Sequence, residues 1–344
     1  MTQKKRHFLV RIVKQTTNSI NKRRRNFLKR RPHRSFRLTR RRDYKRSLAL
    51  PGYWSFTHEV WRIIKNNKWL FIKFILVYSV LTGFVMGIMS QTSYQLLNNT
   101  IHDVGTNILK GQVGGLGQNL AIFGGVISGT FNTPLTEAQQ LYGSFFFILG
   151  WLTMVWLLRQ IMAGTKDLRL RDGLYSSGGP LIATFFIVMV IFIQIIPFAL
   201  AIIAYVAAQS VEIFDDTLFT TLFWLIELLL VAMSSFWITS SLLSLVIVTL
   251  PGMYPTKALR AAGDLVTSRR LRILYRFIWL LITFIIIWFI ALLPAIALSN
   301  IPFLKNIPIV PLAMLFTASF SLVWGSTYIY LLYRKLVDDD AAPS

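Results

Sequence analysis

The stretch WRIIKNNKWLFIKFILVYSVLTGFVMGIM, residues 61–89, decides the fold class of this chain. From Trp69 to Met89 it is an apolar run of about the 20 residues that a helix needs to cross the hydrocarbon core of a bilayer. Lys73 is close enough to the start of the run for its ammonium group to reach the headgroups. The stretch therefore predicts a first transmembrane helix.

The residues just before this run predict a helix at the membrane surface. Between Ser55 and Lys68, the side chains of Phe56, Val60, Ile63 and Ile64 share one helical face among basic neighbours. Trp residues punctuate the same segment, as is typical of a membrane–water interface.

Further apolar runs complete an all-α integral membrane protein. We expect six transmembrane helices in three hairpins, with cytosolic interfacial helices between them. A chain that is 54% hydrophobic, with a mean hydropathy of +0.54, agrees with this class. The expected membrane domain is 54–335, with spans at 69–89, 143–161, 180–208, 218–250, 278–298 and 309–333. A long polar connection is expected at 90–140, and an acidic, disordered tail at 336–344.

The first 46 residues are a separate, basic segment. They hold 19 of the 37 Lys and Arg and a single acid, Asp43, so they carry a net charge of +18 out of +23. Such a block of like charges is expected to be largely disordered or to form a surface helix. The other basic clusters fall in alternate loops, at 159–179 and 251–276. This pattern predicts a multi-pass plasma (inner) membrane protein with both termini in the cytoplasm.

One pattern recurs three times along the chain: a basic, partly amphipathic segment leads into a span, and this span forms a hairpin with the next one. The third copy, ALRAAGDLVTSRRLRILYR (258–276), resembles the cytosolic helix before the fifth span in the six-span membrane domain of some glycerophosphodiester phosphodiesterases and in the related YciC-like inner-membrane proteins. WRIIKNNKWLFI (61–72) looks like the approach to the first span in those families. The resemblance covers the layout of residues 55–335 and carries no catalytic residue, because no phosphodiesterase domain is attached.

The basic segments are candidate contacts for a polyanion. Anionic lipid is the favoured partner because the arm is tethered beside a membrane, and RNA or a ribosome is the alternative. The candidate residues are Lys22, Arg23, Arg24, Arg25, Lys29, Arg30, Arg31, Arg40, Arg41, Arg42, Arg269 and Arg270.

Glu227 is an acid inside the fourth span, and we predict that it is a functional carboxyl or a hydrogen-bonded packing residue, with Gln194 as a candidate partner. Small residues that let helices approach closely are Gly83, Gly87, Ser234 and Ser241. These contacts lie within one chain or join it to a second copy or another membrane protein.

No catalytic chemistry is apparent in the sequence. The chain has no Cys, and its four His have no metal-ligand spacing. We therefore expect no enzyme activity, no cofactor and no metal site. The favoured function is a scaffold or accessory factor whose arm binds anionic lipid. The alternatives are a transporter of small solutes or lipids that uses Glu227, and a ribosome-facing factor for membrane-protein biogenesis.

Overall fold

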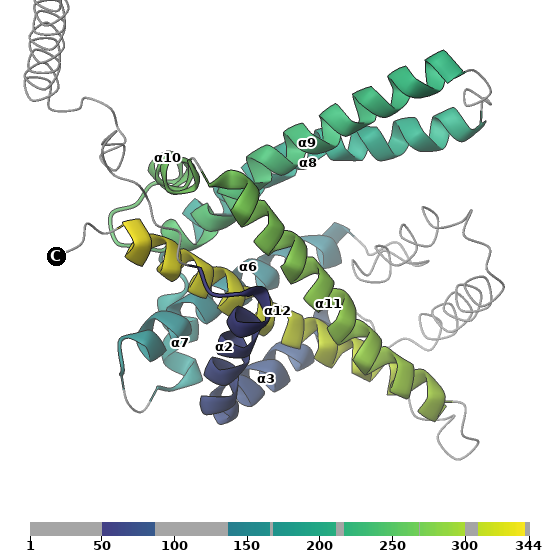
Figure 1. Ribbon diagram of the computed structural model, residues 1–344. Helices are drawn as coiled ribbons and strands as arrows, with labels where there is room; N and C mark the ends of the chain where they lie inside the picture. Colours follow the sequence, from purple (N-terminus) through teal and green to yellow (C-terminus); the bar gives the residue numbers. More distant parts are fainter. Residues whose placement is uncertain are drawn as a thin grey trace, which may run out of the picture. The chain divides into compact units, whose positions relative to one another are not determined.

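The computed structural model describes residues 50–86, 137–165, 168–210, 217–267, 269–299 and 309–340. The chain divides into two units, Met1–Ser47 and Leu48–Ser344, and all described residues belong to the second unit. Within these ranges the regular elements are α-helices, without any strand (Figure 1). The all-α class is therefore confirmed. The basic arm, the 90–140 connection up to residue 136 and Gly87 lie outside the described residues.

The helices are bounded as follows: α2 Tyr53–Asn66, α3 Lys68–Met86, α6 Glu137–Met162, α7 Leu170–Ser176, α8 Leu181–Ser210, α9 Thr217–Ile247, α10 Pro255–Val266, α11 Arg270–Ser299 and α12 Ile309–Asp340. Five of them, α6, α8, α9, α11 and α12, are long and apolar enough to cross a membrane, or six if the bent pair α2–α3 counts as one span. The chain thus has the helices of a multi-pass membrane protein. In the described part, α3 contacts α6, α8 contacts α9 and α11 contacts α12.

Three helices extend well beyond the ranges expected from the sequence. α6 begins at Glu137 rather than at 143, so the last residues of the expected 90–140 connection are helical. α11 begins at Arg270 rather than at 278, because the basic residues before the apolar run are themselves helical. α12 continues to Asp340, so residues 336–340 form its last turn rather than a disordered tail. Neither Gly nor Pro interrupts 326–340, and contacts described below hold the end of the helix.

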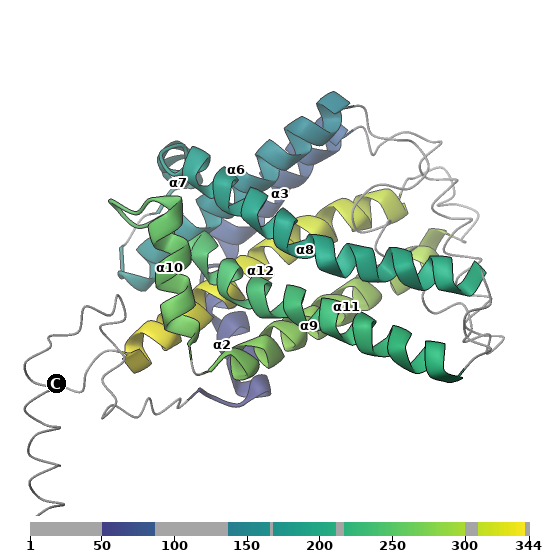
Figure 2. The same cartoon turned by 90° about the horizontal axis from the view of Figure 1, so that it is seen from above.

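α12 is the helix around which the others pack. It contacts α2, α3, α6, α9 and α11, and Figure 2 shows it between the α3–α6 pair and α11. Tyr328, Leu332 and Leu336 of this helix are fully buried. The largest buried cluster contains these residues and the C-terminal parts of α6 and α9. The helices are therefore packed most tightly near the C-terminal ends of α6, α9 and α12.

The α8–α9 hairpin is packed much less. Only 11% of the apolar stretch of each of these helices is buried, against 56% for α6 and α12. Figure 1 shows their outer parts extending side by side away from α11 and α12. Nearly all of this surface is apolar, as lipid contact requires.

α2 and α3 meet at an angle of 85°. Asn67 forms the corner: its backbone N–H and its side-chain amide both donate to the carbonyl of Ile63, and the N–H of Leu70 donates to the carbonyl of Asn67. The expected amphipathic helix is present, and Phe56, Val60 and Ile64 are its buried face.

Candidate functional site

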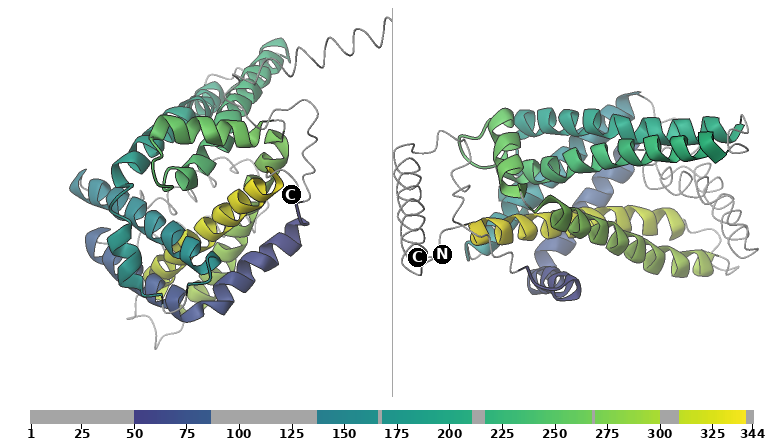
Figure 3. Two further views of the ribbon diagram at one scale, coloured as in Figure 1. Left: turned by 90° about the vertical axis from the view of Figure 1, so that its left-hand side faces the viewer. Right: turned by 45° about the horizontal axis from the view of Figure 1, so that its top comes forward.

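Every Lys and Arg in the described part of the chain lies near one end of the long helices. These residues lie on or beside α2, α7 and α10, in the first two turns of α3 and α11, and in the last two turns of α6 and α12. The right-hand view of Figure 3 shows α10 and the C-terminal end of α12 on the same side of the helices. We call this region the basic end.

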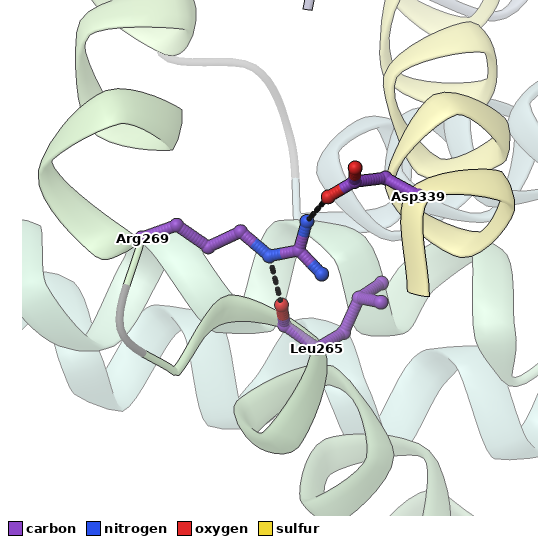
Figure 4. Close-up of polar contacts among 3 residues, drawn as sticks. All are labelled: Leu265, Arg269 and Asp339. Atoms are coloured by element: carbon purple, nitrogen blue, oxygen red, sulfur yellow. Dashed lines mark hydrogen bonds and ion pairs between the residues drawn. The ribbon is translucent and has the colours of Figure 1, made fainter. Parts of the chain in front are cut away.

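An ion pair joins two helix termini at the basic end. Arg269, which immediately precedes α11, donates from Nη1 to Oδ2 of Asp339 in the last turn of α12 at 2.6 Å. Its Nε donates to the carbonyl of Leu265 at 3.1 Å (Figure 4). The side chain of Arg269 is 0% exposed and that of Asp339 is 12% exposed.

This pair corrects the prediction that Arg269 contacts a lipid or another polyanion. Its guanidinium is buried and already has a carboxylate partner from the same chain. The sequence does not indicate this pair, because its two residues are 70 positions apart. Arg270 is half-buried, stacks on the ring of Phe236 at 3.8 Å and donates to the carbonyl of that residue at 3.2 Å.

A second buried arginine, Arg276, holds the start of α2. Its guanidinium lies 4.4 Å from the ring centre of Tyr53 and 5.4 Å from that of Phe56, and its Nη2 donates to the carbonyl of Pro51. Nη1 is buried without a hydrogen-bond partner among the described residues. The hydroxyl of Tyr328 donates to the backbone carbonyl of Arg276 at 3.0 Å. Three elements, α2, α11 and α12, therefore meet at this side chain.

Two further polar contacts tie the basic end together. Arg159 of α6 donates to the carbonyl and the hydroxyl of Thr249, which follows α9, at 3.1 and 2.5 Å. Lys335 of α12 forms a 3.0 Å ion pair with Glu59 of α2. Exposed bases remain on the outside of the region; they are Arg62, Lys65, Lys68, Lys73, Arg169, Arg171, Lys257, Arg260, Arg272 and Arg334.

Inside the spans, Glu227 is 8% exposed and lies on α9. Ser234 and Ser241 follow it at intervals of seven residues, so the three share one face of the helix, and all three are buried. The hydroxyl of Ser234 donates to the backbone carbonyl of Gln194 on α8 at 2.5 Å. Gln194 is therefore opposite Ser234, about 10 Å along α9 from Glu227. The side-chain oxygen of Gln194 is buried without a hydrogen-bond partner in the described part.

The other predicted packing position that the structure describes, Gly83, lies against α12 of the same chain. A Cβ atom at this glycine would lie 3.2 Å from a methyl group of Leu315. One turn earlier, the hydroxyls of Ser79 and Ser319 are 2.7 Å apart. The close approach of α3 to α12 thus comes with a hydrogen bond between buried hydroxyls, as in other packed membrane helices.

The ten candidate residues between Lys22 and Arg42 lie outside the described residues. Among the described residues, no group of three or more His, Asp or Glu is arranged to hold a metal ion. The sequence reading missed Arg276 and Asp339. One signal was present: Arg269 and Arg276 are seven residues apart and so fall on the same inward face.

No protein-family model, curated protein or solved structure matches this chain.

Proposed function

We propose that this chain is a non-enzymatic membrane scaffold or accessory factor whose N-terminal arm binds anionic lipid at the cytoplasmic surface of the plasma (inner) membrane. The observation that carries this function is the confinement of Lys and Arg, within the described residues, to one end of the long helices. Such an asymmetry marks the cytoplasmic side of a membrane protein. The described residues also begin at this end, since Pro51, just before α2, accepts a hydrogen bond from Arg276.

The charge of the arm supports lipid as its partner. Each base held near an anionic leaflet contributes about 1 kcal/mol, so a third of the 19 bases of the arm is enough for firm binding. An arm tethered beside the leaflet also meets lipid at a high effective concentration.

Most polar groups of the spans are used in contacts between or within helices. Ser79 and Ser319 bond to each other, Ser234 bonds across to α8, and the indole N–H of Trp324 donates to the hydroxyl of Thr283 at 3.2 Å. Hydroxyl groups that form these hydrogen bonds do not line a polar path for a solute. Their use in helix packing therefore favours a scaffold over a transporter.

The arm is tested with a label in the full chain. Because the chain has no Cys, Thr39→Cys gives a single site for an environment-sensitive fluorophore beside Arg40, Arg41 and Arg42. In vesicles with anionic lipid, the emission should shift to the blue. The shift should disappear in neutral vesicles, at high salt, and when the three arginines are replaced by Gln. A response to added ribosomal RNA, without any response to anionic lipid, contradicts this function and favours the RNA-facing alternative.

A transporter of small solutes or lipids is the second candidate, because Glu227 is a buried carboxyl inside a span. Proton-coupled flux of candidate solutes into proteoliposomes separates the two functions. Flux that Glu227→Gln abolishes and the matched change Glu59→Gln preserves contradicts the scaffold function. Glu59 is the suitable control because it pairs with Lys335 at the basic end.

A further inference from the structure

The amphipathic helix α2 is covered by the protein on its most apolar face. Phe56 and Val60 are fully buried and Ile64 is 6% exposed, and the ring of Phe56 packs edge-on against Tyr328 of α12 at 4.8 Å. A helix at a membrane surface ordinarily turns its apolar face to the lipid. In this protein the lipid must meet another face of α2.

A second face of α2 combines aromatic rings with a base. Trp54, Trp61 and Lys65 are spaced by seven and four residues, so they share one face. Trp54 is 73% and Trp61 47% exposed, and Lys65 is exposed. The third face is polar, exposed and free of aromatic rings; it holds Ser55, Arg62 and Asn66.

Contacts with α12 show which edge of α2 is directed toward the spans. The ring of Trp61 lies 6.4 Å from that of Trp324, whereas Glu59 pairs with Lys335. Trp324 and Lys335 are eleven residues apart, or about 16 Å along α12. Lys335 is at the basic end and Trp324 is in the apolar part of the helix. The Trp61 edge of α2 is therefore on the membrane side and the Glu59 edge is on the water side.

Contacts with α11 give the same direction. Arg276 lies over the rings of Tyr53 and Phe56. Trp279, one turn farther into the span, instead meets the rings of Tyr53 and Trp54, with ring centres 5.5 and 5.1 Å away. Both exposed Trp rings thus lie along the side of α2 that is directed toward the apolar parts of α11 and α12.

We infer that this second face of α2, continued by Lys68 and Trp69 at the start of α3, binds the headgroups of anionic phospholipids. Trp69 is 69% exposed, and the ammonium of Lys68 lies 5.9 Å from the centre of its ring. The 85° corner lays α2 across the direction of α3, as a helix in the plane of the headgroups requires. Trp rings favour this depth, and Lys supplies the charge that pairs with lipid phosphate.

This site is on the folded helices and does not depend on what the arm binds. It extends the proposed function, because the body of the protein then contacts the same leaflet as the arm. Both experiments below keep residues 1–46 unchanged, so failure at α2 and failure of the labelled arm are separate results.

The first experiment measures the depth of each face in the full chain reconstituted into vesicles with a 3:1 ratio of neutral to anionic phospholipid. Spin labels are placed at Trp61→Cys and Lys65→Cys on the second face, and at Ser55→Cys and Asn66→Cys on the third. We expect the second-face labels to collide more with oxygen, and the third-face labels to collide more with an aqueous nickel complex. Equal nickel accessibility on both faces overturns the inference. Lys65→Cys keeps both Trp rings, so it decides the outcome if Trp61→Cys does not fold.

The second experiment measures lipid selectivity. Native mass spectrometry counts the anionic lipids retained by the chain and by the double variant Lys65→Gln/Lys68→Gln. We expect retention to fall by about two- to five-fold for each base removed. The matched control, Lys257→Gln/Arg260→Gln, removes the same charge from α10. An equal fall in the control, or no fall in the α2 variant, overturns the inference.

Discussion

The ion pair between Arg269 and Asp339 provides the sharpest test of the packing at the basic end. Asp339→Asn removes the negative charge and changes the side-chain shape very little. Arg269 then keeps its hydrogen bond to Leu265, but its buried charge loses the carboxylate. Removal of one partner from a buried pair typically costs 3–5 kcal/mol, and the 12% exposure of the Asp339 side chain favours the lower limit, about 3 kcal/mol.

The measurement is thermal unfolding of the purified protein in one detergent. For a chain of this size, about 3 kcal/mol corresponds to a fall in Tm of about 4 °C. The matched control is Asp338→Asn, because it makes the same chemical change one residue earlier at an exposed position. Its Tm should stay within about 1 °C of the unchanged chain.

A double variant separates the pair from a general effect of charge. If Arg269 is replaced by Met as well, no buried cation remains, so Arg269→Met/Asp339→Asn should be more stable than Asp339→Asn alone. Equal Tm shifts for Asp338→Asn and Asp339→Asn would refute the reasoning. A double variant whose loss of stability equals the sum of the losses of Arg269→Met and Asp339→Asn would refute it as well.

Helix packing gives two further predictions, both measured as Tm in the same detergent. Gly150→Ala should destabilise the protein by about 1–3 kcal/mol, because a Cβ atom there would lie 2.6 Å from the ring of Tyr78; Gly263→Ala is the control, since nothing lies within 4 Å of its Cβ position and Ala favours helix. A Gly150→Ala protein as stable as Gly263→Ala would contradict the close packing. Ser234→Ala should cost about 0.6 kcal/mol through loss of the hydrogen bond to Gln194, and an unchanged Tm would show that this bond contributes nothing.

The sequence was sufficient for the all-α class of the protein and for its amphipathic helices. Apolar runs of bilayer length identified the long helices, and a period of 3.6 identified the buried faces of α2 and α10. In α10, which falls in the partly amphipathic segment 258–276, the apolar stripe of Ala258, Ala262, Leu265 and Val266 is the buried face. These features follow from local composition and spacing, so they need no knowledge of what the helices pack against.

Partners distant in the sequence could not be predicted in the same way. Arg269 and Asp339 are separated by 70 residues, and Arg276 reaches Pro51 across 225. The sequence of a basic run is the same whether its cations are exposed to water or buried beside a carboxylate. The acidic terminus also looked disordered because composition alone carries no information on a buried arginine nearby.

The surfaces of α2 show why a hydrophobic pattern alone does not identify the face that meets the membrane. Phe56, Val60 and Ile64 make the clearest apolar stripe, and protein covers it, with Phe56 packed against Tyr328 of α12. The less regular stripe of Trp54 and Trp61 is left uncovered. A shorter α12 would remove the Lys335–Glu59 ion pair and the Arg269–Asp339 pair, while the Phe56–Tyr328 contact would remain. The last turns of α12 therefore add the Lys335–Glu59 pair to the contacts that hold α2, while its apolar face is already covered at Tyr328.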